Sequence, residues 1–194
     1  IHALGTVGQR VAPPSITTPD EPGVVWLLTS GSTGRPKRVR HTLDSLTTVT
    51  SAHTPRRRLY AYATGSYVWW QVITLGLHHP GNDVICVESH EIAEWPRIAA
   101  SNAVTAVSGT PTFWRDAMWR HGRAVAAIPL EQVTLGGEPV DQPLLDSLQG
   151  LYPRARVSWI YASSEAGAAI AVHDGRAGFP ESWLDRYLPG RPSI

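Results

Sequence analysis

The sequence predicts an α/β fold in three layers, with a largely parallel sheet between two layers of helices. Short apolar runs alternate along the chain with longer segments of helical spacing, as in successive βαβ units. Two of the helical segments begin with capping residues, Thr110 before Pro111 and Asp141. A chain of 194 residues, 42% of them hydrophobic, is long enough to bury one core.

The elements follow in order after residues 1–23, a proline-containing stretch predicted as a linker or lead-in. Strands are predicted over residues 24–29, 59–63, 83–87, 104–107, 132–135, 156–161 and 168–172, and helices over 42 to about 52, 67–77, 92–101, 110 to about 121 and 141–149. We expect residues 24–194 to form one domain. Right-handed crossovers place the loops that follow the strands along one edge of the sheet, where ligands bind.

Charge and composition exclude several kinds of partner. Basic and acidic residues number 17 and 16, a formal charge of +1, which argues against nucleic acid or a membrane surface. No apolar stretch approaches the roughly 20 residues of a membrane span. The single cysteine, Cys86, excludes a disulfide or a cysteine metal site within the chain. We expect a cytoplasmic protein.

Residues 29–37 have the chemistry of a phosphate-binding loop. Two glycines, Gly31 and Gly34, allow successive backbone N–H groups to point at one anion. The hydroxyl-bearing residues are Thr29, Ser30, Ser32 and Thr33, and the loop ends at Lys37, the only lysine of the chain. We expect the next helix to aim its N-terminal dipole at the same point. The glycine spacing does not match the P-loop of kinases and GTPases, and composition alone also fits an ordinary flexible connection.

The order of residues in this loop resembles the signature of the adenylate-forming superfamily, T-S-G-[ST]-T-G-x-P-K. This superfamily contains acyl-CoA synthetases, nonribosomal adenylation domains and luciferases. Every signature position matches, and the first departure is Arg38, where the family usually has glycine. The resemblance implies that the chain is a subdomain of the adenylate-forming fold.

Two later motifs resemble the same family in the same order. Gly136-Gly137-Glu138 resembles the GGE or GAE loop that lies against adenine. Residues 161–165 read Tyr-Ala-Ser-Ser-Glu and resemble Y-G-x-T-E, with Ala162 in place of glycine and Ser164 in place of threonine. Taken alone, each motif also fits an ordinary turn or an exposed loop acid.

The resemblance implies a role for each matched residue. Residues 29–37 would hold the β- and γ-phosphates of ATP, and Glu165 would bind Mg²⁺. Ser164 would contact the α-phosphate. Adenine and the acyl group would be framed by Gly136, Gly137, Glu138 and Tyr161. The implied catalytic residues are Lys37, Ser164 and Glu165.

The implied activity is ATP-dependent activation of a carboxylic acid as acyl-AMP, for transfer to CoA or to the phosphopantetheine thiol of a carrier protein. Gly65 stands where the amino-acid-activating branch has an aspartate, and a buried ammonium without a counter-charge is costly. The sequence therefore favours an aryl or acyl acid over an α-amino acid.

The resemblance covers about residues 24–175. The family's T-G-D aspartate, N-terminal subdomain and mobile C-terminal domain have no counterpart in this chain. We therefore expect a nucleotide-binding core, incomplete or inactive alone, whose partners are the missing C-terminal domain or an acyl carrier protein. Two alternatives stay open: a degenerate, non-catalytic member of the family that binds nucleotide or protein, and an unrelated α/β phosphate-binding protein.

Overall fold

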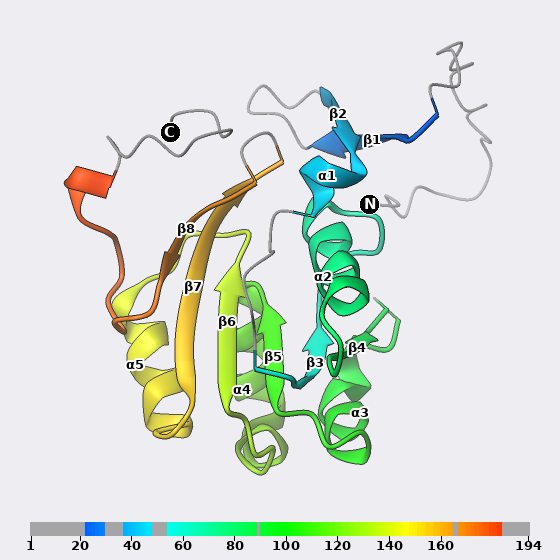
Figure 1. Ribbon diagram of the computed structural model, residues 1–194. Coiled ribbons are helices and arrows are strands. Elements are labelled where there is room, and N and C mark those ends of the chain that lie inside the picture. The colour runs from blue at the N-terminus through cyan, green and yellow to red at the C-terminus, as the bar shows by residue number, and fades with distance from the viewer. Residues whose placement is uncertain (1–21, 30–36, 48–53, 89, 165–166, 184–194) are drawn as a thin grey trace, which may run out of the picture.

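A six-stranded sheet organises the chain (Figure 1). The computed structural model describes residues 22–29, 37–47, 54–88, 90–164 and 167–183. In spatial order the strands are β4 (Asp83–Cys86), β3 (Arg57–Tyr60), β5 (Ala106–Gly109), β6 (Gln132–Gly136), β7 (Arg156–Ser163) and β8 (Gly167–Val172). All neighbouring strands pair in parallel except β8, which runs antiparallel to β7. The predicted α/β fold with a largely parallel sheet is confirmed.

Helices cover the two faces of this sheet (Figure 1). On one face, α2 (Tyr67–His78) packs over β3 and β4 through a small cluster of Tyr60, Val72 and Leu75. The opposite face carries the main core, beneath α3 (Trp95–Ser101), α4 (Pro111–Ala126) and α5 (Gln142–Leu151). Two short 3₁₀ turns, η1 (Ile92–Glu94) and η2 (Glu181–Trp183), complete the elements outside the hairpin described below.

Strand periodicity explains which side chains form the main core. Val133 and Leu135 of β6 are both 0% exposed and point into it, together with Trp114 of α4. The alternate residues of β6, Gln132 and Thr134, therefore face the other side of the sheet. Burying each of the large aliphatic side chains contributes roughly 1.5–3 kcal/mol.

The predicted caps are present at both helices that carry them. Thr110 accepts a hydrogen bond from the N–H of Phe113 at 3.1 Å, and Asp141 accepts one from the N–H of Leu144 at 3.1 Å. The α4 helix runs past its predicted end near His121, where φ −124° and ψ 17° mark a kink.

The first predicted strand lies outside the main sheet. β1 (Val24–Thr29) and β2 (Lys37–Thr42) form a separate antiparallel pair. The helix predicted from Thr42 is present over residues 43–46 of the described chain, but β2 separates it from the predicted phosphate loop, so the expectation that its N-terminal dipole points at that loop is wrong. Alternation explains the strand, because Val39 and His41 are partly or fully covered whereas Arg38 and Arg40 are exposed. The helix α1 (Leu43–Leu46) begins later, at the N-cap Thr42.

Hydrogen bonds from α2 hold α1, the short helix that directly follows the hairpin, and so attach the hairpin to the rest of the domain. The carbonyl of Leu46, a fully buried residue, accepts from the Gln71 amide at 2.6 Å and from the Thr74 hydroxyl at 3.2 Å. The Tyr67 hydroxyl donates to the Ser45 carbonyl at 3.2 Å. Because α2 also packs on β3 and β4, it fixes the hairpin relative to the sheet.

This attachment predicts the effect of Gln71→Leu. The substitution removes a buried donor to the Leu46 carbonyl, and we expect it to lower the free energy of unfolding by about 1–2 kcal/mol. Hydrogen exchange should show faster exchange of the β1 and β2 amides, with little change in β5 and β6. Leu77→Ala is the control, because Leu77 lies on the same helix and is 79% exposed. Unchanged protection of the hairpin would contradict the role given to Gln71.

Candidate functional site

Loops that follow the parallel strands gather at one end of the molecule. The carboxyl ends of β3, β5, β6 and β7 lie at the upper end in Figure 1, and the β1–β2 hairpin lies at that end too. The described members of the predicted site are Thr29, Lys37, Gly136, Gly137, Glu138, Tyr161 and Ser164. Ser30, Gly31, Ser32, Thr33, Gly34 and Glu165 lie outside the described residues, so their roles stay predictions.

The hairpin brings the two ends of the predicted phosphate loop together. Thr29 and Lys37 are directly paired, at the end of the β1–β2 ladder that residues 30–36 connect. Lys37 is exposed, and Thr29 is partly exposed. Arg38, where the sequence departs from the family signature, lies with its guanidinium 5.7 Å from the centre of the Trp26 ring. This cation–π contact accounts for an arginine at that position.

A tight turn after β6 is built on two glycines. Gly137 has φ +83°, in the left-handed region that favours glycine. A Cβ at Gly136 would lie 3.5 Å from the Tyr62 hydroxyl oxygen and 3.6 Å from the Ile160 carbonyl oxygen. Gly136 is buried beside Tyr62 and β7, whereas Gly137 is exposed.

Glu138 attaches this turn to α4. Its carboxylate accepts hydrogen bonds from the backbone N–H and the hydroxyl of Thr112, at 2.9 and 2.7 Å. Thr112 lies in the first turn of α4, so the helix dipole also favours the negative charge. Burial alone would raise the pKa of Glu138, but the bonds from Thr112 and the charge of Arg115 outweigh it, and the pKa lies below its ordinary value. The sequence did not reveal Thr112 as the partner of Glu138.

Tyr161 lies in the last part of β7 and is 46% exposed. Phe179 lies on one side of this ring, with the two centroids 6.4 Å apart, and also packs on Trp159 at 6.0 Å. An exposed aromatic ring held by a second one is suited to stack on a nucleotide base. The neighbouring Ala162, which replaces the family's glycine, belongs to the extended strand β7 and has no positive φ, so its methyl group causes no backbone strain.

Among the described residues, no group of three or more His, Cys, Asp or Glu side chains is placed to hold a metal ion. A Mg²⁺ ion that is bound with ATP needs only one or two carboxylates, because phosphate oxygens and water complete its coordination. Glu165 has the right donor chemistry for that role and follows the described Ser164 directly.

Comparison with known proteins decides the family, because residues 4–193 match the AMP-binding enzyme family. The chain belongs to the AMP-binding enzyme family. No curated protein sequence matches the chain significantly. No helix in the described part of this family member is long and apolar enough to span a membrane.

Solved structures agree with the family assignment. CmiS6 is 25% identical with a TM-score of 0.54, over 61% of this chain and 30% of its own. IdnL1 is 28% identical with a TM-score of 0.53, over 61% of this chain and 25% of its own. The N-terminal subdomain of Klebsiella oxytoca NpsA, in complex with 3-hydroxybenzoyl-AMSN, is 18% identical and shares the fold, with a TM-score of 0.62 over 83% of this chain and 41% of its own. This AMP-binding family member thus spans well under half the length of these proteins.

The position of Glu138 predicts a pH-dependent contribution to stability. The native pKa of Glu138 is below its unfolded value of about 4.3, so the contribution is complete above about pH 5 and is lost as the pH falls through the native pKa. Glu138→Ala should lower the free energy of unfolding at pH 7 by about 1 kcal/mol. Glu138→Gln should cost less and should flatten the stability profile between about pH 3 and 5.

Chemical denaturation at a series of pH values measures this contribution. Glu181→Gln, which changes an exposed carboxylate in η2, is the control and should leave the profile unchanged. A Glu138→Gln profile that parallels the unmodified chain would show that the Thr112 bonds contribute no net stability.

Proposed function

We propose that the chain is the nucleotide-binding part of a protein that activates an aryl or acyl carboxylic acid as acyl-AMP. Membership of the AMP-binding enzyme family supports adenylate-forming acid activation in general. The observation that carries the proposal is that the β1–β2 hairpin, which pairs Thr29 with Lys37, lies at the end of the molecule where β6 and β7 have their carboxyl ends.

The reaction requires positioning and charge neutralisation more than covalent chemistry by the protein. A carboxylate oxygen of the acid attacks the α-phosphorus of ATP, and pyrophosphate leaves. In this proposal Lys37 neutralises charge on the β- and γ-phosphates, the loop hydroxyls donate hydrogen bonds to them, and the Ser164 hydroxyl donates to the α-phosphate. Glu165 holds Mg²⁺, which neutralises phosphate charge. The Tyr161 ring and the Gly136–Gly137 backbone orient adenine and the acyl group.

The preference for an acid without an α-amino group rests on the loop before α2. Gly65 has φ +78° and no atom within 4 Å of an added Cβ, so it offers no counter-charge to an ammonium. The carboxylate of Glu88 is close by, but it accepts a hydrogen bond from the Thr64 hydroxyl at 2.6 Å. If an amino acid supported the reaction and Glu88→Gln abolished that activity, this preference would be wrong.

We further propose that residues 24–194 form the nucleotide-binding core of a longer cytoplasmic enzyme, and that residues 1–23 are a linker. A C-terminal domain or an acyl carrier protein would then complete the reaction, with the thiol of CoA or phosphopantetheine as acceptor. A degenerate, non-catalytic member of the family is the alternative. Acid-dependent pyrophosphate exchange by the full-length protein distinguishes the two, since a degenerate member would bind nucleotide without exchange.

Calorimetric titration with Mg-ATP tests the nucleotide site directly. We expect Lys37→Ala and Glu165→Gln each to weaken binding about tenfold or more, because charged hydrogen bonds contribute about 1.5–3 kcal/mol. Arg38→Ala is the matched control, because Arg38 is next to Lys37 but lies over Trp26. Tight binding that neither substitution changes would place the nucleotide elsewhere and contradict the proposal.

A further inference from the structure

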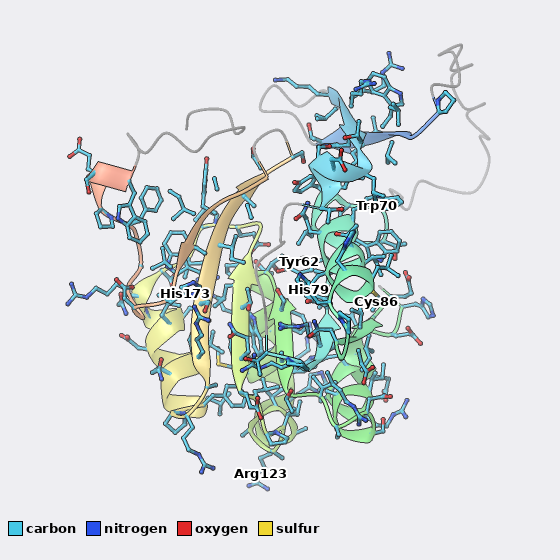
Figure 2. The ribbon with its side chains drawn as sticks, in the orientation of Figure 1. Tyr62, Trp70, His79, Cys86, Arg123 and His173 are labelled. Carbon is cyan, nitrogen blue, oxygen red and sulfur yellow. The ribbon has the colours of Figure 1, made fainter. Side chains whose placement is uncertain are left out.

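A cleft opens at the amino end of the main sheet, opposite the end that carries the proposed nucleotide site. Its volume is about 520 Å³, within the roughly 300–1,000 Å³ of small-molecule sites. The amino ends of β3, β5 and β6 lie at the lower end in Figure 1, and Figure 2 shows Arg123 at the same end. The charged residues that line the cleft precede or begin β3, β4 and β6, and are Arg56, Arg57, Asp83 and Glu131.

Arg56 is the most buried of these charged side chains. Its side chain is 19% exposed, against 54–65% for Arg57, Asp83 and Glu131. Two hydrogen bonds fix its backbone. The Arg56 N–H donates to the side-chain oxygen of Asn82 at 3.2 Å, and the Arg56 carbonyl accepts from the N–H of Asp83 at 3.2 Å. The least solvated charge of the cleft is therefore positive and held in place.

The guanidinium of Arg56 has one interaction with the described part of the chain. Its Nε lies 3.3 Å from a carboxylate oxygen of Glu131, in an ion pair that is too poorly aligned for a hydrogen bond. A guanidinium has five N–H donors, and a buried donor without an acceptor is unfavourable. The two terminal nitrogens of Arg56 therefore remain to bind an acceptor that enters the cleft.

The two carboxylates of the cleft also keep acceptors for a ligand. Asp83 accepts a hydrogen bond from Nε of Arg57 at 3.1 Å through one oxygen, and Glu131 contacts Arg56 through one oxygen. The second oxygen of each carboxylate forms no hydrogen bond with a described residue. Two arginines and two carboxylates give the cleft no net formal charge. A simple anion would meet two carboxylates and a simple cation two arginines, whereas a molecule with both charges finds a partner for each.

We propose that this cleft binds a compact zwitterion. Its anionic group, a carboxylate or a phosphate, would accept from the terminal nitrogens of Arg56, because the planar guanidinium matches both groups. Its ammonium would donate to the second oxygens of Glu131 and Asp83. The inference is independent of the proposed function, since these residues lie at the opposite end of the sheet from the nucleotide site.

Amide chemical shifts of the full chain, recorded by NMR, test this site with defined probes. The zwitterions are β-alanine, 4-aminobutyrate and phosphoethanolamine, which distinguish a carboxylate from a phosphate. Butyrate and butylammonium each carry one of the two charges of 4-aminobutyrate. Amides of Arg57, Thr105 and Glu131 report on the cleft, and the amide of Lys37 reports on the nucleotide site.

At least one zwitterion should shift the cleft amides saturably and leave Lys37 unchanged. It should bind about tenfold or more tightly than butyrate or butylammonium, because each of these lacks one charged contact. Arg56→Gln should weaken its binding about tenfold or more. Glu131→Gln should weaken the zwitterion but not butyrate, since it removes a partner of the ammonium alone.

Arg123→Gln is the matched control, because it removes an exposed arginine at the same end of the molecule but outside the cleft. It should leave the affinity unchanged. The amide spectrum of each variant shows whether it is folded, and Glu131→Gln and the single-charge probes test the site even if Arg56→Gln does not fold.

Three results would overturn the inference. The first is the absence of a saturable shift at the cleft amides with every zwitterion. The second is an affinity for butyrate equal to that for the zwitterions, or one that Arg56→Gln and Glu131→Gln leave intact. The third is a shift at Lys37 without a shift in the cleft, which would place the zwitterion at the other end of the sheet. None of these results changes the expected binding of Mg-ATP.

Discussion

Parallel pairing of β3, β5, β6 and β7 forces the chain to cross back to the same end of the sheet after each strand. Each crossover leaves from the carboxyl end, so the segments after these strands lie at one edge although they are far apart in sequence. For this reason Tyr62, the Gly136–Gly137 turn and Ser164, which follow or end three different strands, all lie at the carboxyl ends of those strands. If these strands were not parallel, the segments that follow them would lie at different ends of the sheet and could not contact one ligand.

Two attachments hold the segments of the proposed site that lie outside the main sheet. The β1–β2 hairpin lies outside the main sheet and depends on α2, whose Gln71 and Thr74 donate to the Leu46 carbonyl. The turn after β6 depends on α4, through Glu138 and Thr112. The two helices pack on opposite faces of the sheet, so the segments of the proposed nucleotide site are attached from both sides. A ligand that contacts hairpin and turn together would stabilise the whole domain.

Local interactions could be predicted from the sequence, and long-range ones could not. The caps of α4 and α5 were predictable because Thr110 and Asp141 bond to residues three positions ahead. β2 was missed because residues 38–41 are mostly polar and were left without an element before the helix predicted from Thr42, and only the pairing with β1 reveals the strand. Glu138 and Thr112 are 26 positions apart, and Tyr62 and Ser108 are 46 apart, so only the folded sheet reveals these contacts. The order of the motifs in the sequence predicted which segments form the site. The residues that hold those segments in place could be identified only from the structure.

The most direct test of the account replaces Mg²⁺ by Mn²⁺ and records paramagnetic broadening of amide resonances in the presence of ATP. The account predicts strong broadening at Lys37, Ser164 and Gly137 together, because one metal–nucleotide complex lies between the hairpin and the ends of β6 and β7. Amides at the opposite end of the sheet, such as Arg156, should stay sharp. Broadening at the hairpin without Ser164, or centred on Arg156, would contradict a single nucleotide site at the carboxyl edge.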